Sequence, residues 1–228
     1  MRFEDLNWMD VEEYLKHEDR LILVIGACEQ HGYLSLLSDV KIPLALADAA
    51  SQQTGVLVAP PLNFGCSPYF MTYPGTLSLR VATLTAVTED LVRSAHGYGF
   101  RRILVLNGHG GNAPARGQLR EAANALPDLK LGWYDWWISH SVEQVAVKHD
   151  LKPYHANWLE AFSFTIVGEL PEGEKVPPRV PSEVMDAATS RRVYGDGSFG
   201  GRYRVDESIM QEMFNACLQD ILQLLKFE

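Results

Sequence analysis

The fold is decided by the stretch Arg101-Arg102-Ile103-Leu104-Val105-Leu106-Asn107-Gly108-His109-Gly110-Gly111-Asn112. Its apolar run, residues 103–106, has the length and composition of a buried strand. The glycines that follow permit positive φ and close backbone approach, so a turn is expected there. Asn112 is a good N-cap for a following helix. His109 therefore lies where a buried strand opens into a loop, which is where ligands bind in open parallel sheets. Taken alone, the stretch favours a hydrogen-bonded turn histidine beside a glycine-rich bend.

The pattern of strands and helices along the chain predicts the fold class. Residues 21–25 form a second all-apolar run that Gly26 ends, as in a central parallel strand. Further strands are expected at 55–59, 129–133 and 161–167, and helices at 8–16, 42–51, 83–98, 115–126 and 206–227. Because strands alternate with helices, we expect a single three-layer α/β domain, residues 1–228, with a mostly parallel sheet flanked by helices.

Two irregular segments are rich in aromatic side chains. The loop from 60 to 79 contains Tyr69, Phe70 and Tyr73, and loops of this length inside a domain are usually functional. A patch at 133–137 holds three tryptophans, and Trp158 follows further on. These tryptophans first predict core packing and second a cover over a small planar ligand.

Composition excludes several classes of protein. Twenty Lys and Arg against 29 Asp and Glu give a formal charge of −9 without a basic stripe, so no nucleic-acid partner is expected. No apolar leader or membrane-length apolar run occurs, which predicts a cytoplasmic protein without a membrane partner. Cys28, Cys66 and Cys217 are far apart and form no CxxC, which argues against a disulfide framework and a thiolate zinc site.

Four polar side chains near two strand ends predict a metal site. Glu29 and His31 follow the strand at 21–25 and point to the same side of an extended backbone. Asp39 lies eight residues beyond His31, and His109 arrives from the other strand. Nitrogen and oxygen ligands without thiolate suit zinc, manganese or ferrous iron, and a carboxylate such as Asp39 can bridge two ions. Singly, each has an ordinary interpretation as a helix N-terminal carboxylate, a turn histidine or a cap.

A fourth stretch adds His155 and Glu160 as candidates. Five residues separate them, which does not place them on one face of a helix, so a shared site requires a turn between them. The ordinary interpretation is a surface histidine and a salt-bridged glutamate.

The ordered set of these motifs resembles the creatininase, or creatinine amidohydrolase, superfamily. The residues that resemble its motifs are Glu29-Gln30-His31-Gly32, Pro74-Gly75-Thr76-Leu77-Ser78-Leu79, Asn107-Gly108-His109-Gly110-Gly111-Asn112, His155 with Glu160, and Gly195-Asp196-Gly197. They fall in the family's order and span most of the chain. The resemblance implies a creatininase-like α/β domain that binds two divalent ions per chain, zinc, manganese or iron. It also implies a homo-oligomer, in this family a hexamer.

The resemblance also assigns roles to residues. It implies that Glu29, His31, Asp39 and His109 are metal ligands with Asp39 bridging, that Glu160 is a further ligand and catalytic candidate, and that His155 is catalytic. The activity implied is cleavage of an amide or cyclic amide bond of a small molecule by a metal-activated water. His155 would protonate the leaving nitrogen, and Asn107 or backbone N–H groups of the glycine turn would hold the oxyanion.

Several positions depart from the family pattern. The segment from His31 to Asp39 is one residue shorter and lacks a second histidine. Other departures are Tyr69-Phe70 in place of Glu-His, Ala161-Phe162 in place of Thr-Ser, and Gly111 in place of an acidic ligand. The pocket is therefore expected to be more apolar, and creatinine is not the expected substrate. Two alternatives stay open: a binding or assembly protein with a degenerate site on the same scaffold, and a hydrolase of a non-amide small substrate.

Overall fold

A four-stranded parallel sheet forms the centre of the computed structural model, which describes residues 1–228. The strands are β1 (Arg20–Ile25), β2 (Leu57–Val58), β3 (Arg102–Asn107) and β4 (Lys130–Asp135), in the order β2-β1-β3-β4. In the register of β1 and β3, Ile25 lies opposite Asn107. Both strands therefore end at the same level, and the residues that follow them leave from one edge of the sheet.

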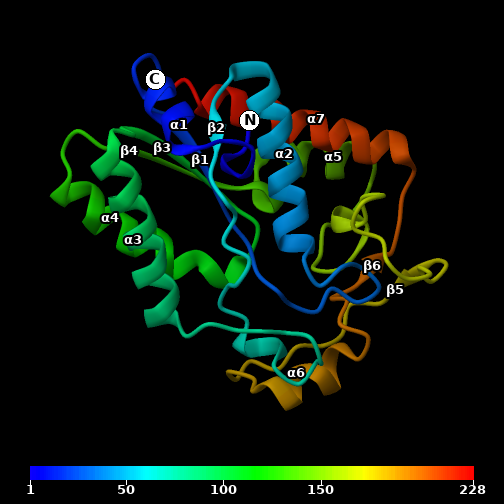
Figure 1. The fold of residues 1–228 in the computed structure, drawn as a ribbon. Coiled ribbons are helices and arrows are strands. Elements are labelled where there is room, and N and C mark those ends of the chain that lie inside the picture. The colour runs from blue at the N-terminus through cyan, green and yellow to red at the C-terminus, as the bar shows by residue number, and fades with distance from the viewer.

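Helices cover both faces of the sheet, as the alternating pattern predicts (Figure 1). One face packs against α1 (Trp8–Leu15), α3 (Val81–Tyr98) and α4 (Ala113–Ala125), and the other against α2 (Ser38–Thr54), α5 (His140–Lys148) and α7 (Glu207–Leu224). Successive residues of β1 alternate between the two cores, with Leu21 and Leu23 on the first side and Ile22 and Val24 on the second. The three-layer α/β architecture is thus confirmed.

The predicted strand at 161–167 is wrong. The segment folds as irregular turns after a short 3₁₀ helix, and its only ladder contact is a single bridge between Leu34 and Ile166. The Thr165 hydroxyl donates to the backbone carbonyls of Glu160 and Phe162 and so favours a turn over an extended ladder. Of the apolar residues that suggested a strand, Ala161 and Phe162 are buried, whereas Phe164, Ile166 and Val167 are exposed.

Two helices and an earlier helix start were not predicted. α5 and α6 (Ala187–Tyr194) are short, and each begins at a cap residue, Ser139 and Asp186, whose side chain accepts a backbone N–H. α2 begins at Ser38, four residues before the predicted start, which places Asp39 in its first turn. The remaining short elements are η1 (Phe3–Asp5), η2 (Pro68–Phe70), η3 (Gly110–Asn112), η4 (Trp136–Ile138), η5 (Trp158–Glu160), β5 (Glu174–Lys175) and β6 (Gly201–Arg202).

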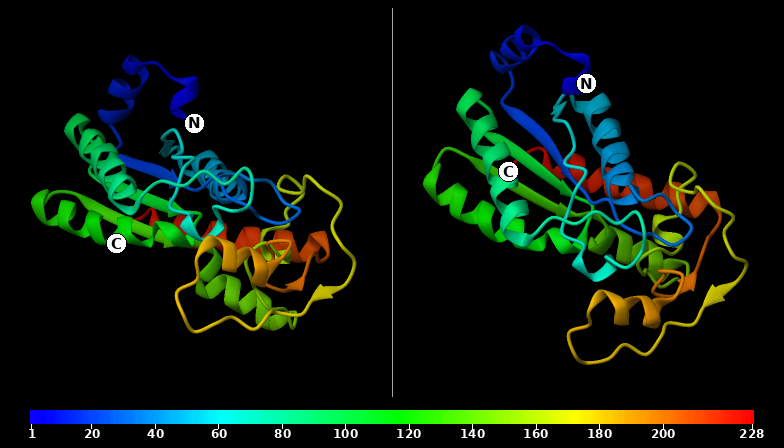
Figure 2. Two further views of the ribbon diagram at one scale, coloured as in Figure 1. Left: turned by 90° about the horizontal axis from the view of Figure 1, so that it is seen from below. Right: turned by 60° about the horizontal axis from the view of Figure 1, so that its bottom comes forward.

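The loops that follow the strands gather at one end of the molecule. Figure 2 shows α6 and the long connection before it at that end, while both chain termini lie toward the opposite end. None of the helices combines the length and hydrophobicity that a membrane span requires.

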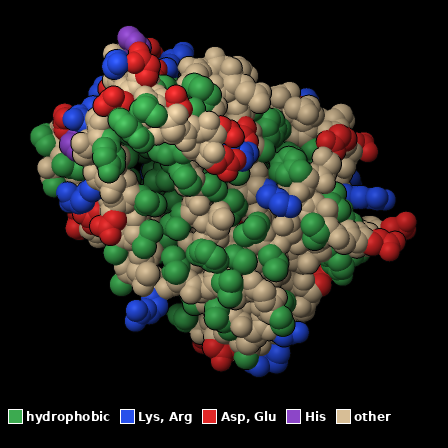
Figure 3. Space-filling model, in the orientation of Figure 1, with side chains coloured by type: hydrophobic (Ala, Val, Ile, Leu, Met, Phe, Trp, Pro, Cys, Tyr) green, Lys and Arg blue, Asp and Glu red, His purple; other side chains and the backbone are tan.

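Hydrophobic side chains also occur on the surface, between α1 and α3. A hollow of about 600 Å³ there is lined by Trp8, Leu91, Tyr98 and other apolar residues, and Figure 3 shows hydrophobic side chains gathered over this face. The hollow lies on the α1–α3 side of the sheet, away from the residues that follow β1 and β3.

Candidate metal centre

The segment after β1 is held by the loop at 74–79. The N–H of Leu77 donates to the carbonyl of Cys28, and the N–H of Gln30 donates to the Thr76 hydroxyl oxygen. The N–H of Glu29 donates to the carbonyl of Leu36 across the turn that follows. This loop, which the sequence marked as a motif, therefore fixes the backbone that carries Glu29 and His31.

Asp39 reaches the site because two glycines let the start of α2 approach the strand ends. A Cβ atom at Gly26 would lie 2.5 Å from the Asp39 carbonyl oxygen, and one at Gly108 would overlap that oxygen outright. Real Cβ atoms essentially never come within 3.0 Å of such neighbours. Glycine is required at both positions because no side chain fits between β1, β3 and the first turn of α2.

His109 is positioned by a network centred on Asn107. The Asn107 amide nitrogen donates to the backbone carbonyl of His109 (2.9 Å) and to the carboxylate oxygen Oδ1 of Asp135 (2.7 Å). Its amide oxygen accepts from the His109 N–H (3.2 Å) and from Asn112 (3.2 Å). With both ends of its amide engaged, Asn107 is not free to hold an oxyanion, contrary to one of our expectations; it shapes the turn instead.

The predicted ligand residues meet in one buried cluster at this edge of the sheet. His31 Nε2 lies 2.9 Å from Asp39 Oδ1 and 3.7 Å from Glu160 Oε1. His109 Nδ1 lies 3.0 Å from Asp39 Oδ2 and 3.5 Å from Glu29 Oε1. Each oxygen of Asp39 therefore faces a different imidazole. All five side chains are at least nine-tenths buried.

Backbone carbonyls fix which nitrogen of each imidazole faces the carboxylates. A carbonyl only accepts, so His31 Nδ1 donates to the carbonyl of Glu29 (3.1 Å) and His109 Nε2 donates to that of Cys66 (2.9 Å). In neutral imidazoles this leaves the lone pairs of His31 Nε2 and His109 Nδ1 directed at carboxylate oxygens. Lone pairs facing one another repel unless a proton or a cation lies between them.

The pKa values of the two imidazoles show that the cluster favours positive charge. Burial opposes protonation of His109, but Glu29 and Asp39 outweigh it and raise its pKa to about 9. The carboxylates likewise raise the pKa of His31 well above its usual value despite its burial. Burial raises the pKa values of Glu29 and Glu160 to about 7.

The donor set fits two divalent cations. Three ligand atoms lie within 4.8 Å of one another in the trio Glu29, Asp39 and His109, and likewise in the trio His31, Asp39 and Glu160. Asp39 belongs to both. Glu29 Oε2 and Asp39 Oδ2 are buried without a hydrogen-bond partner, which is costly unless a cation neutralises them. Carboxylate and imidazole ligands suit zinc, manganese or iron.

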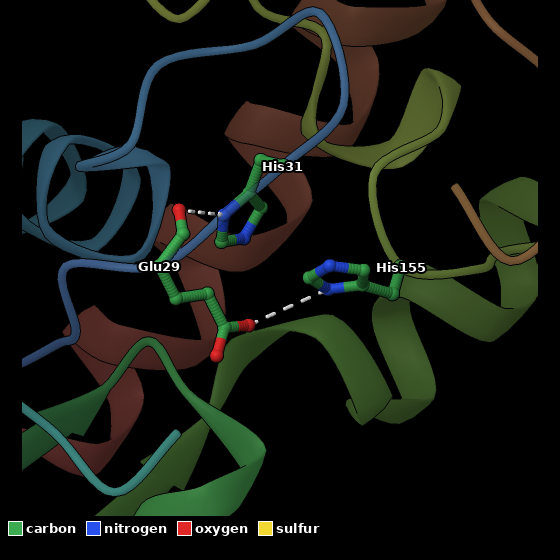
Figure 4. Close-up of side chains that lie close together, drawn as sticks. All are labelled: Glu29, His31 and His155. Carbon is green, nitrogen blue, oxygen red and sulfur yellow. Dashed lines mark hydrogen bonds and ion pairs between the residues drawn. The ribbon is translucent and has the colours of Figure 1, made fainter. Parts of the chain in front are cut away.

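His155 faces Glu29 and His31 (Figure 4), and one of its ring nitrogens lies within 4.8 Å of a ligand atom of each. Its Nδ1 is 3.8 Å from Glu29 Oε1, and its Nε2 is held by the backbone carbonyl and side-chain amide of Gln30. Burial lowers the pKa of His155 well below its usual value, and the neighbouring His31 adds to this. The turn required between His155 and Glu160 is present, and within it the N–H of Ala156 donates to Glu160 Oε2 at 2.6 Å.

A cavity of about 680 Å³ opens in front of the cluster. Glu29, Asp39, His109, His155 and Glu160 line its inner end. The aromatic segments contribute to its walls: Tyr69 and Phe70 come from the long loop and Trp137 from the tryptophan patch. Trp136 and Trp158 are instead fully buried core residues, in line with the first interpretation.

Sequence reasoning missed three contributors to the site. Ser67 Oγ lies 3.2 Å from His109 Nε2, and Phe199 lines the cavity from the distant Gly-rich segment. The Gln30 amide bridges His155 and the carbonyl of Gly197. Only Gln30 carried a signal, since it stands between the two ligand candidates Glu29 and His31.

Fold and cluster together define an α/β protein with carboxylate and imidazole side chains at the carboxyl edge of a parallel sheet. The chain belongs to the creatininase family: the family's sequence model, described as creatinine amidohydrolase, matches residues 4–225.

Individual relatives agree with this assignment. A mycofactocin precursor peptide peptidase from Mycolicibacterium smegmatis is 36% identical over 221 residues, 88% of this chain and 83% of that protein. The creatinine amidohydrolase of Pseudomonas putida is 35% identical over 112 residues, which span 46% of this chain and 43% of that relative, less than half of its length. A crystal structure of creatininase superposes with a TM-score of 0.84 at 24% identity, covering 97% of this chain and 95% of that one. At that identity the likeness shows the fold.

Proposed function

We propose that this chain is a hydrolase that uses two divalent cations to cleave a carbon–nitrogen bond of amide type in a small molecule or short peptide. The observation that carries the proposal is the sharing of Asp39 between two buried trios of ligand atoms, directly beneath the cavity. A solved creatininase containing manganese has the same fold, with a TM-score of 0.83 and 22% identity. The Mycolicibacterium smegmatis relative, named as a peptidase, supports an amide bond as the target.

The residues have separate tasks in this proposal. Glu29, Asp39 and His109 hold one cation, and His31, Asp39 and Glu160 hold the other. Bound cations of this kind lower the pKa of water and polarise a carbonyl group. His155, kept neutral by burial, donates its Nε2–H to the backbone carbonyl of Gln30 and so exchanges a proton at Nδ1. It takes the proton of the attacking water and delivers it to the leaving nitrogen, without which an amide does not break.

The test begins with metal content. Protein freed of metal with a chelator and dialysed against zinc or manganese is expected to bind about two ions per chain. A protein that rejects zinc, manganese and iron would overturn the proposal. Amine release from small amides, lactams and short peptides is then measured with and without metal.

Substitution of His155 separates an enzyme from a binding protein on the same scaffold. His155→Gln keeps the size of the side chain, so it is expected to leave metal content unchanged and to lower turnover by about 10²-fold or more. An unchanged turnover would remove His155 from the mechanism, whereas normal ligand binding without any turnover in the wild type would favour the binding protein.

A second candidate is hydrolysis of a non-amide substrate. It is favoured by a Thermotoga maritima relative named 3-dehydro-scyllo-inosose hydrolase, 28% identical over 166 residues, 70% of this chain and 52% of that protein. Consumption of a cyclic polyol ketone without amine release would select this candidate. A homohexamer in the cytoplasm remains part of the proposal, and size-exclusion chromatography with light scattering tests the assembly.

A further inference from the structure

The cavity in front of the cluster is lined by no lysine or arginine. The charged lining residues are Glu29, Asp39 and Glu160. Together with His109 and His155 they form the inner end of the cavity. The remaining side-chain surface is apolar or aromatic, apart from Ser67 and the tyrosine hydroxyls. Its larger members are Pro68, Tyr69, Phe70, Val81, Trp137, Ile138, Pro153, Tyr154, Leu159 and Phe199.

One wall is a preassembled aromatic stack. The rings of Phe70 and His155 are stacked with centroids 4.9 Å apart, and those of Tyr194 and Phe199 are stacked at 4.0 Å. Phe70 and Phe199 lie 6.0 Å apart, and the Tyr69 hydroxyl donates to that of Tyr194. Because these rings hold one another in place, they present an uncharged surface that does not need to be ordered on binding.

Part of the cavity's lining is apolar and open to solvent, and Val81 and Ile138 form this rim. Ile138 is 69% exposed and Val81 is 48% exposed, although both line the cavity. Two arginines of neighbouring segments, Arg191 and Arg116, are engaged elsewhere, and Arg80 and Lys152, which precede the lining residues Val81 and Pro153, do not line the cavity themselves. Arg191 donates to the Thr72 carbonyl and lies over the Tyr73 ring, and Arg116 lies 3.8 Å from Asp135. Neither Arg191 nor Arg116 lines the cavity.

Charge therefore limits what can occupy the cavity. Inside the cavity but out of reach of the cations, a carboxylate or phosphate would be desolvated without a counter-ion, because no lysine or arginine lines it. An apolar or aromatic group would bury apolar surface against the stack and the rim. We propose, resting on the proposed function, that the substrate carries an uncharged aromatic or apolar group beside the scissile bond, and that Ile138 sets the rejection of anionic substrates at the rim.

Hydroxamates test this without knowledge of the substrate, because the hydroxamate group binds the cations and its substituent occupies the cavity. The probes are acetohydroxamate, benzohydroxamate and 4-carboxybenzohydroxamate, titrated calorimetrically into the zinc-loaded protein. Benzohydroxamate is expected to bind about tenfold more tightly than acetohydroxamate because its ring is buried. It is also expected to bind about tenfold more tightly than the carboxylated analogue, whose charge is unpaired. Equal affinities for the two aromatic probes, or for benzohydroxamate and acetohydroxamate, would overturn the inference.

A pair of exposed substitutions tests the role of the rim. Ile138→Arg adds a cation to the rim at a solvent-exposed position, and Val147→Arg adds one on α5, where Val147 is 74% exposed and outside the cavity lining. Ile138→Arg is expected to raise the affinity for 4-carboxybenzohydroxamate about tenfold relative to that for benzohydroxamate, and Val147→Arg to leave this ratio unchanged. Equal effects of the two arginines would refute the role of Ile138. If no probe binds the zinc-loaded protein, the metal site fails and the inference fails with it.

Discussion

One added methyl group at the turn after β3 tests whether close backbone approach builds the metal centre. In Gly108→Ala the new Cβ would overlap the Asp39 carbonyl oxygen and lie 2.8 Å from its carbon and 2.9 Å from Pro43 Cγ. The obstacle is the backbone of α2, which cannot rotate aside. Overpacking of this kind costs about 1–3 kcal/mol, and we expect about 3 kcal/mol here. For a chain of this size that lowers Tm by about 6–12 °C.

The first turn of α2 must move to relieve this overlap, so the Asp39 carboxylate should leave both trios and zinc content should fall as well. Gly110→Ala is the matched control, because its Cβ would meet nothing nearer than Trp137 Cζ2 at 3.9 Å. That variant should keep its zinc and stay within about 0.5 kcal/mol of the wild type. Thermal unfolding and zinc per chain are measured for both. A Gly108→Ala protein with wild-type Tm and zinc content, or equal losses in both variants, would refute the reasoning.

Three further predictions follow from the cluster and its supports. Asp39→Asn removes the carboxylate common to both trios and should reduce bound zinc, measured by atomic absorption, for both ions rather than one. Asp135→Leu removes one of the two acceptors of the Asn107 amide and should weaken zinc binding about 10–100-fold with the fold retained; wild-type affinity would show that the turn does not need this bond. In the metal-free protein, the pKa values of His31 and His109 are higher in the folded state than in the unfolded state. Their protonation therefore stabilises the folded state fully below the unfolded pKa of 6.5, and the contribution of His109 is lost as the pH rises through its folded pKa of about 9. Urea unfolding should therefore show stability falling from about pH 7 to 9, and an unchanged midpoint would contradict the charge pairing.

Much of the fold could be predicted because local patterns and packing agree. The all-apolar runs at β1 and β3 and the amphipathic helices between them admit few arrangements other than a covered parallel sheet. Predictions failed where the signal was short or ambiguous. The turns at 161–167 have the hydrophobicity of a strand, but the Thr165 hydroxyl donates to the nearby backbone carbonyls of Glu160 and Phe162.

The candidate site likewise contains residues that the sequence could identify and residues that it could not. Its candidate ligand residues could be proposed from residue type and position after the strands, since Glu29 and His109 follow strands of the same sheet. Gln30, Ser67 and Phe199 could not be assigned tasks, because their roles depend on contacts between segments 42 or more residues apart.

By itself, the sequence determined the fold class, the family's motif order and the residues able to hold cations, because hydrophobic periodicity and ligand chemistry are local properties. Only the tertiary structure decided that Asp39 faces two imidazoles at once and that the cavity has no cation in its lining. Those facts depend on register, close approach of glycine backbones and the packing of distant loops, which no local pattern encodes.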